Sequence, residues 1–304
     1  MVFASIVYLT LIFVSMITST VVYHLPVEIN GAVGVGLVSI VLYLIYFCIF
    51  LFFTKKQGHS LRPREMLAHY HIKKVAPKDA MIASTIGLVC IITFVLLQTW
   101  SVGVFSRLGY NEPEFNMLMN NFGEYLLLVF ALAVLPGIIE ELLFRGLIQR
   151  GFMGFGAVTA MFMSAVLFSL FHLSPAQTVY QFFFGLILAW VYFRTKNLTI
   201  PIILHFINNF LIITYEYITQ SFGYELNLDT ITGGALAMLA VSMMTLLLVG
   251  GVVIWKMVSL LPAVTECDGK MKVDEQHRFW SMSNIGFFVC VVVSMALWVV
   301  VFMG

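Results

Sequence analysis

The sequence predicts an all-α protein, a polytopic transmembrane helical bundle of about eight or nine spans. Of its 304 residues, 61% are hydrophobic and only 10% are charged, whereas a soluble domain carries about 25% charged residues. The apolar residues are gathered in long runs, and most basic residues lie in alternate connections between those runs. A soluble chain of this length could not bury so much apolar surface, so the composition excludes a soluble globular protein.

Each of nine apolar runs comes close to the ~20 residues that a helix needs to cross a bilayer. The first begins at Val2 and has neither a basic segment nor a small-residue cleavage site. We therefore expect a retained helix rather than a signal peptide, and one transmembrane domain over residues 1–304. The expected spans are residues 2–24, 32–54, 80–100, 121–150, 154–172, 177–194, 199–220, 233–256 and 282–303.

The distribution of basic residues predicts the orientation of these spans. If the nine helices alternate in direction, all of the 16 lysines and arginines except Arg107 fall on one side. Positively charged connections stay cytoplasmic. We therefore expect an integral, multi-pass protein of the cell (plasma) membrane, with its N-terminus in the cytoplasm and its C-terminus outside.

The largest cytoplasmic segment is a basic loop at residues 55–79. Its basic residues alternate with Leu61, Met66 and Leu67, which suggests a short helix at the surface. The loop is either an ordinary positive-inside connection or a contact for lipid headgroups or a partner.

Two classes of site receive no support from the sequence. The net charge is only +1, and no basic patch with interleaved aromatic residues indicates nucleic-acid binding. The four cysteines show no spacing typical of a disulfide framework or of structural zinc.

Ionisable residues inside the apolar runs are the first candidates for function, because they are costly in a membrane unless they are paired or face water. Glu140 and Glu141 are adjacent, hence about 100° apart on a helix. Glu141 and Arg145 have i,i+4 spacing and can pair. Glu140 then has no local cation, which suits a general base. Pro136 and Gly137 can open or kink this helix one turn earlier. The alternative is a pair of charges at a helix end near the headgroups.

Two later helices add polar residues at one-turn spacing. His172 ends an apolar run with Phe168 one turn before it, and Ser174-Pro175 follow as a stop. His205 and Asn209 are also one turn apart, and their donors on one face make a plausible oxyanion hole. Each pair also has a structural interpretation, as an interfacial histidine or as interhelical hydrogen bonds.

The depths of these residues do not match if every helix stands upright. At 1.5 Å per residue, His172 lies deeper than Glu140, and His205 lies nearer the cytoplasm than either. We therefore expect either that the fourth helix extends beyond the bilayer, or that the fifth and sixth helices tilt and bury their Ser174-Pro175 turn below the outer surface.

Three motifs together resemble those of the CAAX protease and bacteriocin-processing (CPBP, or Abi) family of intramembrane proteases. They are Glu140-Glu141-x-x-x-Arg145, Phe168-x-x-x-His172 and His205-x-x-x-Asn209. The resemblance covers about residues 135–212, which we take as the catalytic motif core. The best-known members have fewer spans, so residues 282–303 are expected to be an additional C-terminal span.

The resemblance implies an all-helical membrane fold with a site in a cavity open to the cytoplasm. It implies that Glu140 and His172 activate water for attack on a peptide bond, and that His205 and Asn209 stabilise the oxyanion. Glu141, Arg145 and Phe168 would be supporting residues. Some members cut prenylated C-terminal CAAX proteins, and others are linked to peptide processing or bacteriocin self-immunity.

The sequence therefore favours a glutamate-type intramembrane endopeptidase without a cofactor, acting on a membrane-associated peptide or protein, CAAX-like in one version. A second version makes Glu140, His172 and His205 ligands of catalytic zinc, although the HExxH spacing is absent. A third hypothesis is a non-catalytic peptide-binding protein, such as an immunity factor or a scaffold. A transporter is disfavoured, because no inverted repeat is visible.

Overall fold

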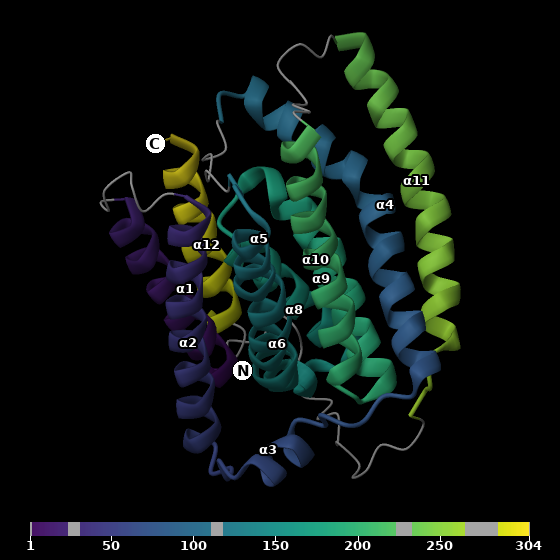
Figure 1. Cartoon of the computed structure of the whole chain (residues 1–304). Coiled ribbons are helices and arrows are strands. Elements are labelled where there is room, and N and C mark those ends of the chain that lie inside the picture. The colour runs from purple at the N-terminus through teal and green to yellow at the C-terminus, as the bar shows by residue number, and fades with distance from the viewer. Residues whose placement is uncertain (1, 24–30, 111–117, 223–232, 265–284, 304) are drawn as a thin grey trace.

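The computed structural model describes residues 2–23, 31–110, 118–222, 233–264 and 285–303, and all regular structure in this part is helical. The predicted all-α fold is confirmed (Figure 1). The main helices are α1 (Val2–Tyr23), α2 (Ala32–Lys56), α3 (Pro63–His69), α4 (Pro77–Arg107), α5 (Phe122–Val129), α6 (Leu135–Glu141), α8 (Ala157–Phe171), α9 (Pro175–Thr195), α10 (Thr199–Phe222), α11 (Gly233–Leu260) and α12 (Ile285–Met303).

The lengths of these helices fit a polytopic membrane protein. Six helical stretches are long and apolar enough to cross a membrane, namely α2, α4, the stretch Phe122–Phe155, α9, α10 and the segment Ala240–Leu260 of α11. Shorter apolar helices at Val2–Thr18, Ala157–Phe171 and Ile285–Val300 complete the set. The predicted spans thus correspond to helices of the structure, and the chain is an integral, multi-pass membrane protein.

The short helix expected in the basic loop is α3. Figure 1 shows it across the end of the bundle where α2 finishes and α4 begins. Pro63 occupies its first turn, where a missing N–H costs nothing. Leu61 and Leu67 are exposed, whereas Met66 packs against the core. The C-terminal end of α12 lies at the opposite end of the bundle.

The stretch Phe122–Phe155 is helical throughout but not uniformly α-helical. Two π-helical segments, η2 (Phe130–Val134) and η3 (Leu142–Gln149), flank α6. Pro136 has no N–H to donate to the carbonyl of Leu132, four residues earlier. The side-chain amide of Asn209 on α10 donates to this carbonyl instead, at 3.1 Å. The helix therefore opens at Pro136, as expected, and α10 supplies the missing donor.

Two features of the structure bear on the depths of the site residues. The helical stretch Phe122–Phe155 has 34 residues, so it is about 50 Å long and exceeds the ~30 Å hydrocarbon core. Helix α8 has only 15 residues, and the turn that follows it is buried at Ser174 and Pro175. His172 therefore ends its helix inside the protein rather than at the far surface.

A glycine brings α6 and α10 into close contact. A Cβ atom at Gly137 would lie 3.2 Å from the backbone nitrogen of Phe206, which is tighter than ordinary van der Waals contact. Because Gly137 has no side chain, the backbones of the two helices approach each other here. This approach places the glutamates at the end of α6 against His205, one residue before Phe206.

Candidate active site

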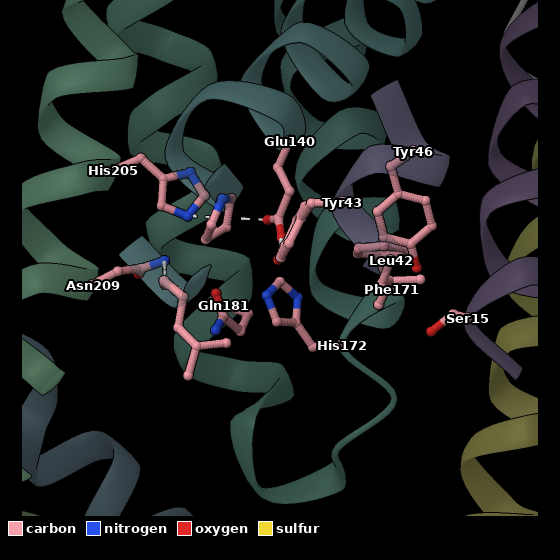
Figure 2. Close-up of a pocket in the computed structure, with 12 residues that line it drawn as sticks. Ser15, Leu42, Tyr43, Tyr46, Glu140, Phe171, His172, Gln181, His205 and Asn209 are labelled. Carbon is pink, nitrogen blue, oxygen red and sulfur yellow. Dashed lines mark hydrogen bonds and ion pairs between the residues drawn. The ribbon is translucent and has the colours of Figure 1, made fainter. Parts of the chain in front are cut away.

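A cavity of about 290 Å³ lies between the helices that carry the predicted site residues (Figure 2). The four predicted catalytic residues line it, namely Glu140, His172, His205 and Asn209. The three predicted supporting residues, Glu141, Arg145 and Phe168, are not among its lining residues. The cavity is also large enough for water molecules. The remaining lining residues are Ser15, Leu42, Tyr43, Tyr46, Leu132, Pro136, Phe171 and Gln181.

The Glu140 carboxylate is held at one oxygen and unpartnered at the other. Its side chain extends from α6 and is almost fully buried, with 3% of the residue exposed. Oε1 accepts a hydrogen bond from the hydroxyl of Tyr43 at 2.6 Å. Oε2 has no hydrogen-bond partner among the described residues and lies 4.0 Å from Nε2 of His205. Buried polar atoms are normally satisfied, so Oε2 is a natural position for a bound water or a substrate group.

The orientation of His172 is set by the end of its helix. His172 caps α8, and its Nδ1 lies 2.9 Å from the carbonyl oxygen of Phe168. A carbonyl can only accept, so Nδ1 carries the proton in this bond. In the neutral imidazole, Nε2 then has a free lone pair, and Figure 2 shows the ring of His172 next to Glu140.

Glu141 forms a buried network with Arg145 and His205. Its Oε1 accepts from Arg145 at 2.9 Å, which is the i,i+4 pair that the sequence predicted. The same oxygen lies 2.8 Å from Nδ1 of His205, a contact that sequence reasoning missed. Both Glu141 and Arg145 are fully buried. Because Nδ1 of His205 donates to Glu141, its Nε2 is the nitrogen turned toward Glu140.

Arg145 joins three helices around the ring of Phe168. It donates a second hydrogen bond to the carbonyl oxygen of Gly185 on α9, at 2.9 Å. Its guanidinium also lies 4.6 Å from the ring centroid of Phe168 on α8, within cation–π distance. The ring of Phe168 in turn lies 5.0 Å from that of His172. Phe168 thus contacts both the buried cation and His172, and it supports the imidazole.

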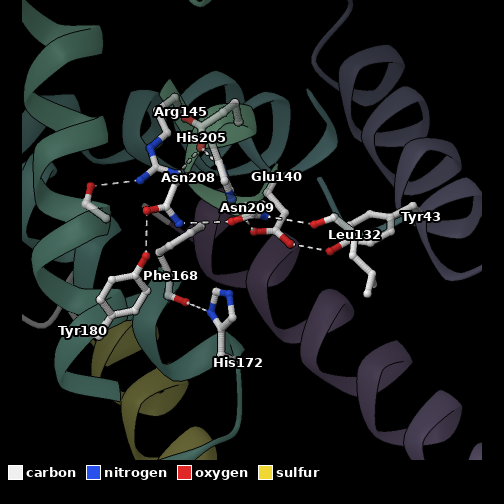
Figure 3. A network of polar contacts seen from close by, with 12 residues as sticks. Tyr43, Leu132, Glu140, Arg145, Phe168, His172, Tyr180, His205, Asn208 and Asn209 are labelled. Carbon is white, nitrogen blue, oxygen red and sulfur yellow. Dashed lines mark hydrogen bonds and ion pairs between the residues drawn. The ribbon is translucent and has the colours of Figure 1, made fainter. Parts of the chain in front are cut away.

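Asn209 is held by a chain of hydrogen bonds that crosses α9, α10 and η2 (Figure 3). Tyr180 donates to Asn208 at 2.8 Å, Asn208 donates to Asn209 at 3.2 Å, and Asn209 donates to Leu132. Asn209 therefore forms an interhelical hydrogen bond, as its structural interpretation predicted. One of its two amide hydrogens is used, so the other is available in the cavity that Asn209 lines.

Sequence reasoning missed several residues that belong to this site. Tyr43, Gln181 and Asn208 are the most informative of them. Gln181 and Asn208 are polar residues within apolar runs, a feature that could have identified them. Tyr43 gave no such indication, because a tyrosine in a membrane helix is common and its partner is 97 residues away.

The zinc alternative needs three donors that are close enough to share one metal ion. Glu140, His172 and His205 all line the cavity, but within the described ranges no group of three or more His, Cys, Asp or Glu side chains is close enough to hold a metal ion.

The packing of Phe168 leads to a prediction for Gly185. A Cβ atom at Gly185 would lie 2.8 Å from Cδ1 of Phe168, and the ring cannot withdraw without moving Arg145 or His172. We expect Gly185→Ala to lower the free energy of unfolding by about 1–3 kcal/mol, typical of overpacking, and to reduce activity. Thermal denaturation in detergent measures the change. Gly251→Ala is the control, because a Cβ there meets nothing within 4 Å. Equal stability of the two variants would contradict this account.

Comparison with known proteins agrees with the resemblance read from the motifs. Residues 122–211 match the family described as type II CAAX prenyl endopeptidase Rce1-like. This segment is less than a third of the chain and contains all three motifs. Comparison with curated proteins found no match, and comparison with solved structures found none. The match confirms the resemblance to the CPBP family and supports its enzyme class, an intramembrane peptide hydrolase.

Proposed function

Since residues 122–211 match a family of CAAX intramembrane proteases, we propose that this chain is a glutamate-type endopeptidase whose Glu140 and His172 activate water. One observation carries the proposal. Oε2 of Glu140 lacks a hydrogen-bond partner in the described structure, and it lies in a cavity that His172 and His205 also line. A water bound in this cavity would give Oε2 its hydrogen-bond partner next to the imidazole of His172.

The reaction follows from these positions. Glu140 accepts a proton from the water as the water oxygen attacks the peptide carbonyl carbon. The carbonyl oxygen becomes an oxyanion in a tetrahedral intermediate. The carbon–nitrogen bond then breaks, and the proton held by Glu140 passes to the departing amine. General acid–base catalysis of this kind typically contributes 10²–10⁴-fold, and it requires no metal.

His205 and Asn209 are proposed to stabilise the oxyanion. With Nδ1 donating to Glu141, Nε2 of His205 is a donor only when the ring is an imidazolium. The bond to Glu141 at 2.8 Å holds the ring in this orientation. Asn209 adds its second amide hydrogen. Each such donor typically contributes 10²–10³ in kcat.

The substrate is proposed to be a membrane-associated peptide or protein. The test is an assay of the purified protein in lipid nanodiscs on a panel of membrane peptides, with prenylated and unprenylated versions of each CAAX-type peptide. Mass spectrometry detects cleavage, and anisotropy detects binding. We expect cleavage of at least one member, unchanged in the presence of a chelator. Binding without cleavage of any member would favour the peptide-binding alternative, and loss of activity with the chelator would favour the zinc version.

The proposed orientation has a direct test. We place the end of the bundle that carries α3 in the cytoplasm, so that the N-terminus is inside and the C-terminus outside. Gln57 directly follows α2 and Leu108 directly follows α4, at opposite ends of the bundle (Figure 1). Each is replaced by cysteine in a background without the native cysteines. An impermeant thiol reagent applied to intact cells should label Leu108→Cys, and should label Gln57→Cys only after permeabilisation. The reverse pattern would invert the topology.

A further inference from the structure

We propose that Tyr43 on α2 is a positioning residue for Glu140, which fixes Oε1 and thereby leaves Oε2 for the water. The inference rests on the proposed function. Helix α2 lies outside the segment 122–211 that matches the protease family, so the bond between Tyr43 and Glu140 joins the motif core to a part of the chain that the match does not cover.

The geometry of this contact is that of a strong hydrogen bond. The hydroxyl of Tyr43 lies 2.6 Å from Oε1 of Glu140, within the 2.5–2.7 Å range of bonds from a hydroxyl to a carboxylate. An ionised carboxylate only accepts, so Tyr43 is the donor. Figure 3 shows Tyr43 and His205 on different sides of Glu140. The two oxygens of Glu140 are therefore distinguished, one facing Tyr43 and the other facing His205.

Aromatic packing holds Tyr43 in place for this role. Its ring meets that of Tyr46 edge-on, with centroids 5.8 Å apart. Tyr46 contacts Phe171 on α8, with centroids 5.6 Å apart, and Phe171 directly precedes His172. The same row of rings thus connects the partner of Glu140 to the element that carries His172. A fixed carboxylate and a fixed imidazole are what a shared water requires.

The consequence for catalysis is specific. Without the Tyr43 hydroxyl, the Glu140 carboxylate can turn about its last bond, and its two oxygens become equivalent toward the cavity. The general base remains present but is less often in the geometry that accepts the proton. Tyr43 does not contact the reacting atoms in this account, so its loss should slow the chemical step without weakening peptide binding.

The experiment compares Tyr43→Phe with Tyr8→Phe on a peptide that the wild type cleaves. Tyr8 is a matched control, because its buried hydroxyl bonds Ser294 at 2.7 Å between α1 and α12, away from the cavity. A bond to a charged group contributes about 1.5–3 kcal/mol, so kcat of Tyr43→Phe should fall about 10- to 150-fold at unchanged KM. Tyr8→Phe should keep both constants.

A second arm uses Glu140→Asp, whose shorter carboxylate is withdrawn from Tyr43. Adding Tyr43→Phe to it should cause no further loss, whereas a merely structural effect would multiply. The proposal would be overturned by a kcat for Tyr43→Phe equal to that of Tyr8→Phe, or by a change confined to KM. The comparison of these two variants tests the proposal even if Glu140→Asp is inactive. If Glu140→Gln also cleaves at the wild-type rate, the proposed function fails. If Glu140→Gln is inactive while Tyr43→Phe behaves like Tyr8→Phe, the proposed function stands and only the role of Tyr43 fails.

Discussion

Glu140→Gln should reduce kcat by about 10²–10⁴-fold, the usual contribution of a general base, while the protein folds normally. Glutamine has nearly the same shape as glutamate, and its amide oxygen can still accept the hydrogen bond from Tyr43. What it cannot do is take a proton from water. We therefore expect the variant to bind a substrate peptide with the affinity of the wild type. Initial rates, peptide anisotropy and thermal denaturation in detergent measure the three properties.

The control for this variant is Glu65→Gln on α3. It makes the same chemical change at a carboxylate whose side chain is 52% exposed and pairs with the exposed Arg62. It should alter neither rate nor stability, since exposed pairs contribute little. Cleavage by Glu140→Gln at the wild-type rate would remove Glu140 from the role of base. A Glu140→Gln protein that fails to fold would instead place the carboxylate among the structural charges.

Arg145→Ala should lower the free energy of unfolding by about 3–5 kcal/mol, the typical cost of removing one partner of a buried ion pair. The substitution leaves the buried Glu141 carboxylate with His205 but without its cation, and it removes the side-chain donor from the carbonyl of Gly185. It also removes the cation that lies over Phe168. The expected result is a lower thermal midpoint and a lower yield of folded protein, with activity falling in parallel.

Arg62→Ala is the matched control, because the Arg62 side chain is 83% exposed. Arg145→Lys is a second comparison. A lysine carries the charge but lacks the planar, forked donors that reach Glu141 and Gly185 together, so it should restore stability only in part. A fully stable Arg145→Ala protein that has selectively lost activity would contradict the structural role and move Arg145 into the chemistry.

The predictions for Glu140→Gln and Arg145→Ala both follow from the different environments that the sequence predicts for Glu140 and Glu141. A one-residue step turns a side chain by about 100°, and a four-residue step returns it to nearly the same face. The spacing of Glu141 and Arg145 was therefore sufficient to predict their pair, which the structure contains. The same reasoning left Glu140 without a local cation, and in the structure it faces the cavity.

The sequence by itself determined what depends on local geometry and on hydrophobicity. It predicted the membrane class, the approximate spans, a short helix in the basic loop 55–79 and the opening of the helix at Pro136, and it gave a buried turn at Ser174 as one way to reconcile the depths. Each follows from side chains close together in the chain, or from the cost of placing polar groups in lipid. The motif residues that line the cavity were also identified, because ionisable groups are rare in apolar runs.

Only the tertiary structure decided which residues meet across helices. The contact between Glu141 and His205 joins residues 64 apart, and that between Tyr43 and Glu140 joins residues 97 apart. Such contacts depend on the depth and rotation of each helix. These are set by packing, through the close approach at Gly137 and the π-helical turns beside Pro136. No spacing along one helix encodes the position of another, so the partners of Glu140 could be found only after the helices were assembled.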